Sequence, residues 1–308
     1  MGLILMCPGQ GSQRVGMGRD LAERFSEARD TFDAIDEALG VSLSRLMWEG
    51  PEEELTLTHN AQPAILAHSA AVLAVAASRL SDVQAAAGHS LGEYSAYVAA
   101  GSLDAATAAR LVRRRGELMY EAGTRRPGAM SAVLGLGTAG VEAACAEASV
   151  NGEVAVAANL NAPDQTVISG DPAAVSRAGD GCKSRGAKRV LPLKVSGAFH
   201  SPLMAPAVQG LREALNASPF TPPRFPVIAN ASAAAVTTAE EARRLLAEQL
   251  TAPVRWTACM ESAAAAAPGA TFVEVGPGSV LSGLLRKIVA GAPTLTLGTA
   301  DEVERFLQ

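Results

Sequence analysis

The stretch VQAAAGHSLGEYSAYVAA, residues 83–100, carries the clearest structural signal in the chain. Residues 83–87 predict a short strand, and the sequence from 93 to 100 is typical of a helix. Between them, Gly88-His89-Ser90-Leu91-Gly92 fits the pattern G-x-S-x-G. A strand, a sharp turn and a helix in this order predict a nucleophile elbow, which lifts the serine hydroxyl clear of a sheet. The alternative is a glycine-bounded loop with an incidental serine.

Outward from this elbow, the chain alternates short strands with helices. Residues 3–7 form an apolar run that ends at Pro8 and a glycine-rich turn, which predicts another buried strand. Further strands are expected at 227–229, 272–275 and 295–297, and helices at 19–39, 51–57, 64–80, 104–122 and 239–250.

Between residues 128 and 195 the pattern changes. It reads strand, helix, strand, strand, helix, strand, which is the order of a ferredoxin-like unit. The sequence therefore predicts an α/β protein in which a small βαββαβ domain, 128–195, is inserted into a large domain formed by 1–127 and 196–308.

Composition narrows the classes of function. The chain has 26 Lys and Arg residues and 31 Asp and Glu residues, which gives a formal net charge of −5. This negative charge does not favour binding to the phosphates of a nucleic acid. The four cysteines and four histidines show no metal-ligand spacing. The most membrane-like stretch, 61–78, contains Gln62, Pro63 and His68 and predicts a buried helix rather than a span. We expect a cytoplasmic protein without a metal site, a membrane or a nucleic-acid partner.

A serine nucleophile needs a base, and His200 is the best candidate. His89 adjoins Ser90 and should point elsewhere on a tight turn, while His59 and His68 precede the serine. His200 follows Ser90 in the chain, which is the order found in α/β-hydrolase-like enzymes. No Asp or Glu stands out as a third member. The sequence leaves open a dyad oriented by a backbone carbonyl and a histidine that merely belongs to the core.

Arg115 lies on the apolar face of the helix expected at 104–122. The i, i+3, i+4, i+7 spacing places it among Ala108, Leu111, Val112, Leu118, Met119 and Ala122. A buried guanidinium must find an anion, because an unpaired buried charge costs several kcal/mol. Either an internal carboxylate pairs with Arg115, or the guanidinium waits for a substrate carboxylate. Gln249 similarly shares the buried side of 239–250, and a buried amide needs partners.

A rival interpretation comes from a different class of protein. Gly135-Leu-Gly-Thr-Ala-Gly140 fits G-x-G-x-x-G between an expected strand and an expected helix, as in a dinucleotide-binding loop. This loop lies inside the small unit, and no acidic residue ends the next strand as a ribose partner. An ordinary strand-to-helix turn is the favoured interpretation.

Six motifs together resemble the malonyl-CoA:acyl carrier protein transacylases. They are Pro8-Gly-Gln-Gly-Ser-Gln13, Gly88-His-Ser-Leu-Gly-Glu93, Arg115-Gly116 with Met119, Asn161-Ala-Pro-Asp-Gln165 with Val-Ile-Ser-Gly170, Phe199-His-Ser-Pro-Leu-Met204, and Glu274-Val-Gly-Pro-Gly278. They cover nearly the whole chain, in the family's order and at similar spacing. The resemblance implies an α/β-hydrolase-like large domain with a ferredoxin-like insert.

The resemblance also implies a site and a mechanism. The implied roles are nucleophile for Ser90, general base for His200, oxyanion donors for the backbone N–H groups of Gln10 and Leu91, carboxylate clamp for Arg115, and pocket lining for Gln249 and Met119. In related polyketide acyltransferases an Ala-Phe-His run accompanies malonyl selection, so Phe199 is expected to narrow the pocket. The implied reaction is a ping-pong transfer from malonyl-CoA through a malonyl-serine ester, without a cofactor in the enzyme.

The resemblance leaves the partner's docking surface and the pathway open. Lys183, Arg185, Lys188, Arg189 and Lys194 form a run without an acid, with Arg113 and Arg114 as additions, and could receive an acidic carrier protein or be a solvated basic surface. Enzymes of fatty acid synthesis, polyketide synthesis and malonate decarboxylation share these motifs. A serine thioesterase or esterase would share Ser90 and His200 but would have no use for Arg115.

Overall fold

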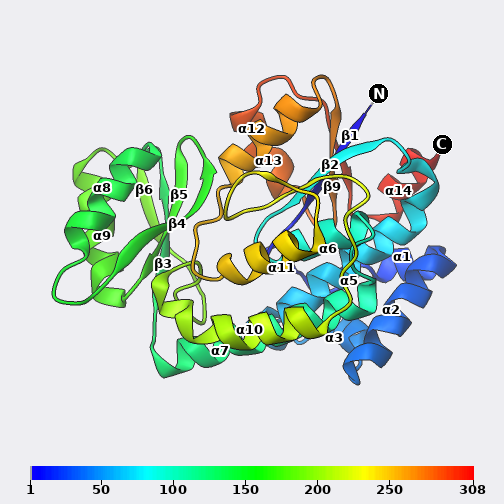
Figure 1. Cartoon of the computed structure of the whole chain (residues 1–308), viewed down its shortest axis with the longest axis horizontal. Helices are drawn as coiled ribbons and strands as arrows, with labels where there is room; N and C mark the ends of the chain where they lie inside the picture. The colour runs from blue at the N-terminus through cyan, green and yellow to red at the C-terminus, as the bar shows by residue number, and fades with distance from the viewer. Residues whose placement is uncertain (1) are drawn as a thin grey trace.

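Two β-sheets organise the chain in the computed structural model, which describes residues 2–308 (Figure 1). The larger sheet has six strands in the spatial order β10-β9-β1-β2-β7-β8, and all its pairs are parallel except the antiparallel β7–β8. Its strands are β1 (Leu3–Cys7), β2 (Val83–Gly88), β7 (Val227–Ile228), β8 (Ala235–Val236), β9 (Thr271–Val275) and β10 (Thr294–Leu297). This sheet with its helices confirms the predicted α/β class.

Helices cover both faces of this sheet, and β1 shows the division between them. Leu5 and Cys7 belong to the larger core, whereas Ile4 and Met6 pack on the other face, with residues of α12 and α13. Successive strand residues point to opposite faces, so a strand covered on both sides needs an unbroken apolar run. The helices around the sheet are α1 (Arg19–Arg24), α2 (Ser26–Leu39), α3 (Leu43–Glu49), α4 (Glu52–Thr56), α5 (Thr58–Ala76), α6 (Gly92–Ala99), α7 (Ala105–Arg125), α10 (Ala205–Ala217), α11 (Ala239–Glu248), α12 (Trp256–Ala266), α13 (Val280–Ile288) and α14 (Ala300–Leu307).

Helix α5 is the apolar helix that the sequence predicted to be buried. The segment Thr58–Arg79 is long and apolar enough to cross a membrane by length and composition alone, but 78% of its most apolar window is buried inside the protein. It packs against α2 and α7 in the larger core. This burial identifies α5 as a helix of the protein core.

A second sheet forms a separate layer at one end of the molecule (Figure 1). Its antiparallel strands, in the order β4-β5-β3-β6, are β3 (Ala129–Leu134), β4 (Ala155–Ala162), β5 (Gln165–Gly170) and β6 (Arg189–Pro192). Helices α8 (Thr138–Ala148) and α9 (Pro172–Ser184) pack on it around their own apolar core. This is the predicted βαββαβ order. We propose on this basis a small domain at 128–195 within a large domain of 1–127 and 196–308.

The structure corrects several expected boundaries. The single helix expected at 19–39 is broken at Phe25, whose extended backbone (φ −121°, ψ 126°) ends α1 and begins α2. Phe25 packs against the larger core, so side-chain burial overrides the helical continuity of the sequence. The last strand of the small sheet ends at Pro192 rather than 195, and the helix expected to begin at 64 begins at Thr58.

Backbone hydrogen bonds and one ion pair fix the small sheet to the large unit. Leu160 N donates to Val254 O (2.9 Å), and Val254 N donates to Ala158 O (2.8 Å). Arg126, after α7, binds both carboxylate oxygens of Asp171, with Nη2 2.7 Å from Oδ1 and 2.9 Å from Oδ2. The edge strand β4 is therefore paired along its free side with Val254 of the large unit.

The turn after β2 tolerates no side chain at its glycines. A Cβ on Gly92 would lie 2.2 Å from the carbonyl oxygen of Cys7. We expect Gly92→Ala to lower the free energy of unfolding by about 3 kcal/mol or more, since the backbone would have to shift. The matched control is Gly283→Ala at an exposed position of α13, where a Cβ meets no atom within 4 Å and the higher helix propensity of alanine should raise the free energy of unfolding by roughly 0.5–1 kcal/mol. Urea unfolding measures both, and equal stabilities for the two variants would contradict this account.

Candidate active site

Ser90 lies in the sharp turn between β2 and α6. Its φ of 54° is in the left-handed region, where a non-glycine residue is uncommon. The side-chain amide of Asn230 holds the turn: Ser90 N donates to Asn230 Oδ1 (2.7 Å), and Asn230 Nδ2 donates to Gly88 O (2.8 Å). The strain is thus offset by fixed partners, as is common where a side chain must be presented in one orientation.

The hydroxyl of Ser90 meets the imidazole of His200. Ser90 Oγ lies 2.7 Å from His200 Nε2, and His200 Nδ1 lies 2.9 Å from the backbone oxygen of Gln249. Because a carbonyl oxygen only accepts, Nδ1 must carry the proton and Nε2 is left to accept from the serine. Burial, and after it the nearby charge of Arg115, lower the pKa of His200 to about 3. The imidazole is therefore neutral, with Nε2 facing the serine hydroxyl.

Arg115 projects from α7 into the same place and is only 1% exposed. It donates to Gln62 Oε1 (2.7 Å) through Nη1, and to Gln249 Oε1 (2.8 Å) and Ser90 Oγ (3.0 Å) through Nη2. Its Nε has no hydrogen-bond partner within the described chain. Each of these acceptors is neutral, so the internal Arg–carboxylate pair that the sequence left open is not formed among residues 2–308.

A pocket of about 440 Å³ opens in front of Ser90. Loops and helices of the large unit and strands of the small sheet line it. They include Gln10, Leu91, Arg115, Met119, Phe199 and His200 from the large unit and Asn159, Asn161 and Val167 from the small one. The backbone N–H groups of Gln10 and Leu91 donate to no group of the part of the chain that the structure describes. Two donors remain available beside the serine, as an oxyanion site requires.

The glycine-rich sequence 135–140 lies elsewhere. It joins β3 to α8, and none of its residues lines the pocket in front of Ser90. In residues 2–308 no group of three His, Cys, Asp or Glu side chains is arranged to hold a metal ion.

Comparisons with known proteins agree with this geometry. A family model described as an acyl transferase domain matches residues 4–300. The chain is 43% identical to the malonyl CoA-acyl carrier protein transacylase of Bacillus subtilis, covering 99% of this chain and 96% of the relative. The chain belongs to the malonyl-CoA:acyl carrier protein transacylase family.

Solved structures of this transacylase family superpose on the chain almost completely. An acyl carrier protein S-malonyltransferase from Vibrio cholerae gives a TM-score of 0.94 at 42% identity, covering 99% of both chains. A malonyl-transacylase in complex with its type II PKS acyl-carrier protein gives 0.95 at 41% identity, covering 100% of this chain and 99% of that one.

Three site residues of this transacylase were missed by sequence reasoning. Gln62 holds Arg115, Asn230 holds the serine turn, and Glu93, which is fully buried, binds Gln249 and Asn230. Burial raises the pKa of Glu93 to about 7. The sequence offered a signal for two of these residues. Gln62 is a polar residue inside an apolar helix, and Glu93 directly follows the G-x-S-x-G motif. Asn230 follows a strand of two residues and had no such signal.

The lowered pKa of His200 predicts a loss of stability in acid. An unfolded histidine titrates near 6.5, so below that pH the unfolded chain binds a proton that the folded chain resists. Between pH 7 and pH 5 the wild type should lose about 2 kcal/mol more stability than His200→Gln, which has no imidazole to protonate at this position. Urea unfolding at the two pH values measures the difference. The same pH dependence in both proteins would show that His200 is not held neutral.

Proposed function

We propose that this protein transfers the malonyl group of malonyl-CoA to the phosphopantetheine thiol of an acyl carrier protein. The observation that carries the proposal is Arg115, a buried guanidinium 3.0 Å from the Ser90 hydroxyl whose acceptors are all neutral. Such a group favours an acyl chain that ends in a carboxylate. The relatives' names supply the donor and the acceptor.

In the first half-reaction Ser90 Oγ attacks the thioester carbonyl of malonyl-CoA while His200 Nε2 takes the hydroxyl proton. The carbonyl oxygen becomes an oxyanion, which the N–H groups of Gln10 and Leu91 stabilise. Collapse expels the CoA thiolate, which takes the proton from His200, and leaves a malonyl-serine ester. In the second half-reaction His200 deprotonates the carrier thiol, which attacks the ester carbonyl, and collapse expels Ser90 Oγ, which takes the proton back from His200 Nε2.

Arg115 has donors left for the malonyl carboxylate. A guanidinium has five N–H groups, and the three contacts above leave one on Nη1 and the one on Nε. Esterification of Ser90 also frees the N–H that now points at Oγ. Met119, which is 2% exposed, and Phe199, which is 6% exposed, line the same pocket and narrow it next to the acyl chain, so a methylmalonyl group should fit less well.

The basic residues predicted to dock the carrier protein differ in whether their side chains already have partners within the protein. Lys183 is paired with Asp180, and Arg185 is paired with Glu147. Lys188 and Arg189 are exposed and belong to no salt bridge in residues 2–308. Arg113 points inward and donates a hydrogen bond to the carbonyl oxygen of His59, so we do not include it in the docking surface. We therefore place the docking surface at Lys188 and Arg189.

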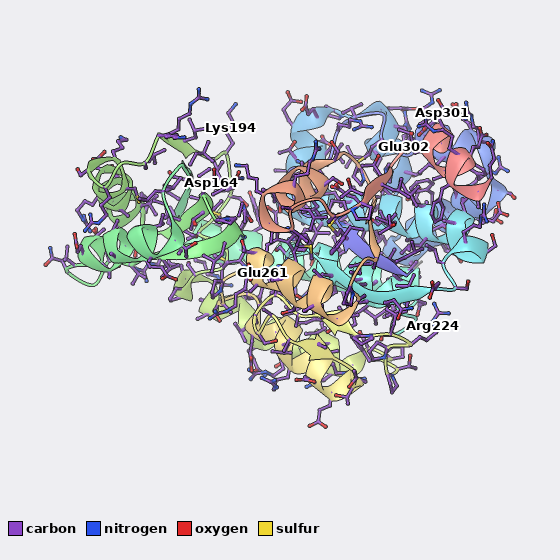
Figure 2. The ribbon with its side chains drawn as sticks, turned by 90° about the horizontal axis from the view of Figure 1, so that it is seen from above. Asp164, Lys194, Arg224, Glu261, Asp301 and Glu302 are labelled. Atoms are coloured by element: carbon purple, nitrogen blue, oxygen red, sulfur yellow. The ribbon has the colours of Figure 1, made fainter. Side chains whose placement is uncertain are left out.

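Lys194 extends the docking surface toward the pocket. It is exposed on the small unit (Figure 2) and lines the mouth of the pocket in front of Ser90. We also place the protein in the cytoplasm, where its four cysteines, all free and buried, would stay reduced.

Intact-mass measurement after mixing with malonyl-CoA tests the proposed function. The wild type should form a malonyl ester, Ser90→Ala should form none, and His200→Ala should form it at least roughly 10³-fold more slowly, because nucleophile and base act as a unit. Release of CoA without an adduct would indicate a hydrolase. A malonyl adduct on Ser90→Ala would show that the nucleophile lies elsewhere.

Arg115→Ala should lower kcat/KM for malonyl-CoA by roughly 10²- to 10³-fold, because the substrate carboxylate loses a buried charged partner. Acylation by acetyl-CoA should change little, since that acyl group has no carboxylate. Arg115→Lys should recover only part of the loss, because a point charge does not reproduce the planar fork. The readout is the malonyl-to-acetyl ratio of Ser90 acylation. A ratio that Arg115→Ala leaves unchanged would remove the main support for a dicarboxylic substrate.

Docking at Lys188 and Arg189 predicts a salt effect confined to the second half-reaction. Raising salt, or the double charge reversal K188E/R189E, should raise the apparent KM for the carrier protein and leave acylation by malonyl-CoA unchanged. Steady-state kinetics with varied carrier protein measures the apparent KM, and rapid-quench kinetics measures the rate of acylation by malonyl-CoA. A carrier KM insensitive to both changes would place the docking surface elsewhere.

A further inference from the structure

Glu93 is a buried carboxylate that the proposed reaction does not use. It lies in the first turn of α6, three residues after Ser90, and is 0% exposed. Its Oε2 accepts from Gln249 Nε2 (2.7 Å) and from the backbone N of Asn230 (2.9 Å), while its Oε1 has no hydrogen-bond partner in the described chain. Burying a carboxylate is costly, so its retention beside the site calls for a role.

The first contact decides which way the amide of Gln249 points. A carboxylate oxygen only accepts, so Gln249 must present Nε2 to Glu93, and this Nε2 also donates to Ser90 O (3.1 Å). Gln249 Oε1 is then left for Arg115 Nη2, at 2.8 Å. The reverse orientation would set the amide NH₂ against the guanidinium, donor against donor. Glu93 thereby fixes the acceptor that holds Arg115.

The second contact serves the serine turn. The Asn230 backbone that donates to Glu93 carries the side chain that accepts from Ser90 N and donates to Gly88 O. One carboxylate oxygen therefore anchors both the turn that presents the nucleophile and the amide that aims the guanidinium. Gln249 also separates Glu93 from Arg115, so the carboxyl group lies near the guanidinium without occupying its free N–H groups.

We propose that Glu93 is a positioning residue for acyl-group selection, which acts through Gln249 to aim Arg115 at the substrate carboxylate. This inference rests on the proposed function. An acyl group without a carboxylate does not need Arg115, so a loss of this aim should reduce malonyl transfer more than acetyl transfer. A residue that only stabilised the fold would reduce both equally.

The test is the malonyl-to-acetyl ratio of Ser90 acylation in Glu93 variants of the full chain. Glu93→Leu, close in volume, removes the acceptor and should lower this ratio by at least about 10-fold, since a hydrogen bond to a buried polar partner is lost and Arg115 is no longer fixed. Glu93→Gln can still accept from Gln249 and Asn230 and should keep the ratio within about 3-fold of the wild type. An unchanged ratio in Glu93→Leu would overturn the proposal.

One control and one fallback variant separate an effect on the position of Arg115 from an effect on folding. Glu274 is also fully buried and accepts from the backbone N–H groups of Leu281 and Ser282, away from Arg115. Glu274→Leu should lower stability in urea but leave the ratio unchanged. If Glu93→Leu does not fold, Glu93→Asp replaces it with the same expectation, because its carboxylate is retracted by one methylene from Gln249.

A double-mutant cycle tests the route through Arg115. In an Arg115→Ala background, Glu93→Leu should have no further effect on the ratio, because its target is already gone. If Glu93→Leu lowers the malonyl-to-acetyl ratio equally in the wild-type and Arg115→Ala backgrounds, Glu93 does not act through Arg115, and the proposal is refuted. If the wild type itself forms no malonyl ester, the proposed function fails, whereas a wild-type ester with an unchanged ratio in Glu93→Leu refutes only this inference.

Discussion

Burying the Arg115 guanidinium beside the Ser90 hydroxyl is the constraint on which the rest of the site depends. A charge taken out of water needs acceptors, and within residues 2–308 these are the neutral oxygens of Gln62, Gln249 and Ser90. The nearest link to an internal carboxylate runs through the amide of Gln249 to Glu93. This arrangement keeps the guanidinium stable when empty, yet leaves N–H groups for a carboxylate that arrives with the substrate.

The same buried charge acts on His200, the proposed base. His200 is held neutral first by burial and then by Arg115, so its pKa is well below that of an effective general base at neutral pH. A malonyl carboxylate on Arg115 would offset the guanidinium charge, and we expect the pKa of His200 to rise as a result. The one buried cation therefore lies within reach of the acyl group and also lowers the pKa of His200.

Local patterns explain what the sequence could predict. The G-x-S-x-G turn and the helical periodicity around Arg115 lie within short segments, so the elbow and the burial of the guanidinium followed from residues 83–122. The partners of Arg115 could not be predicted in this way, because Gln62 and Gln249 lie 53 and 134 residues from it in the chain. The break at Phe25 was missed for a similar reason, since packing against distant residues decides it.

A crystal structure of the malonyl-enzyme tests the central claim most directly. With Ser90 esterified, the malonyl carboxylate should lie within about 3 Å of two guanidinium nitrogens of Arg115, the spacing of a charge-assisted contact. The ester carbonyl oxygen should face the backbone N–H groups of Gln10 and Leu91. A carboxylate turned toward the mouth of the pocket, with Arg115 still bound only to Gln62 and Gln249, would contradict the role of the buried guanidinium.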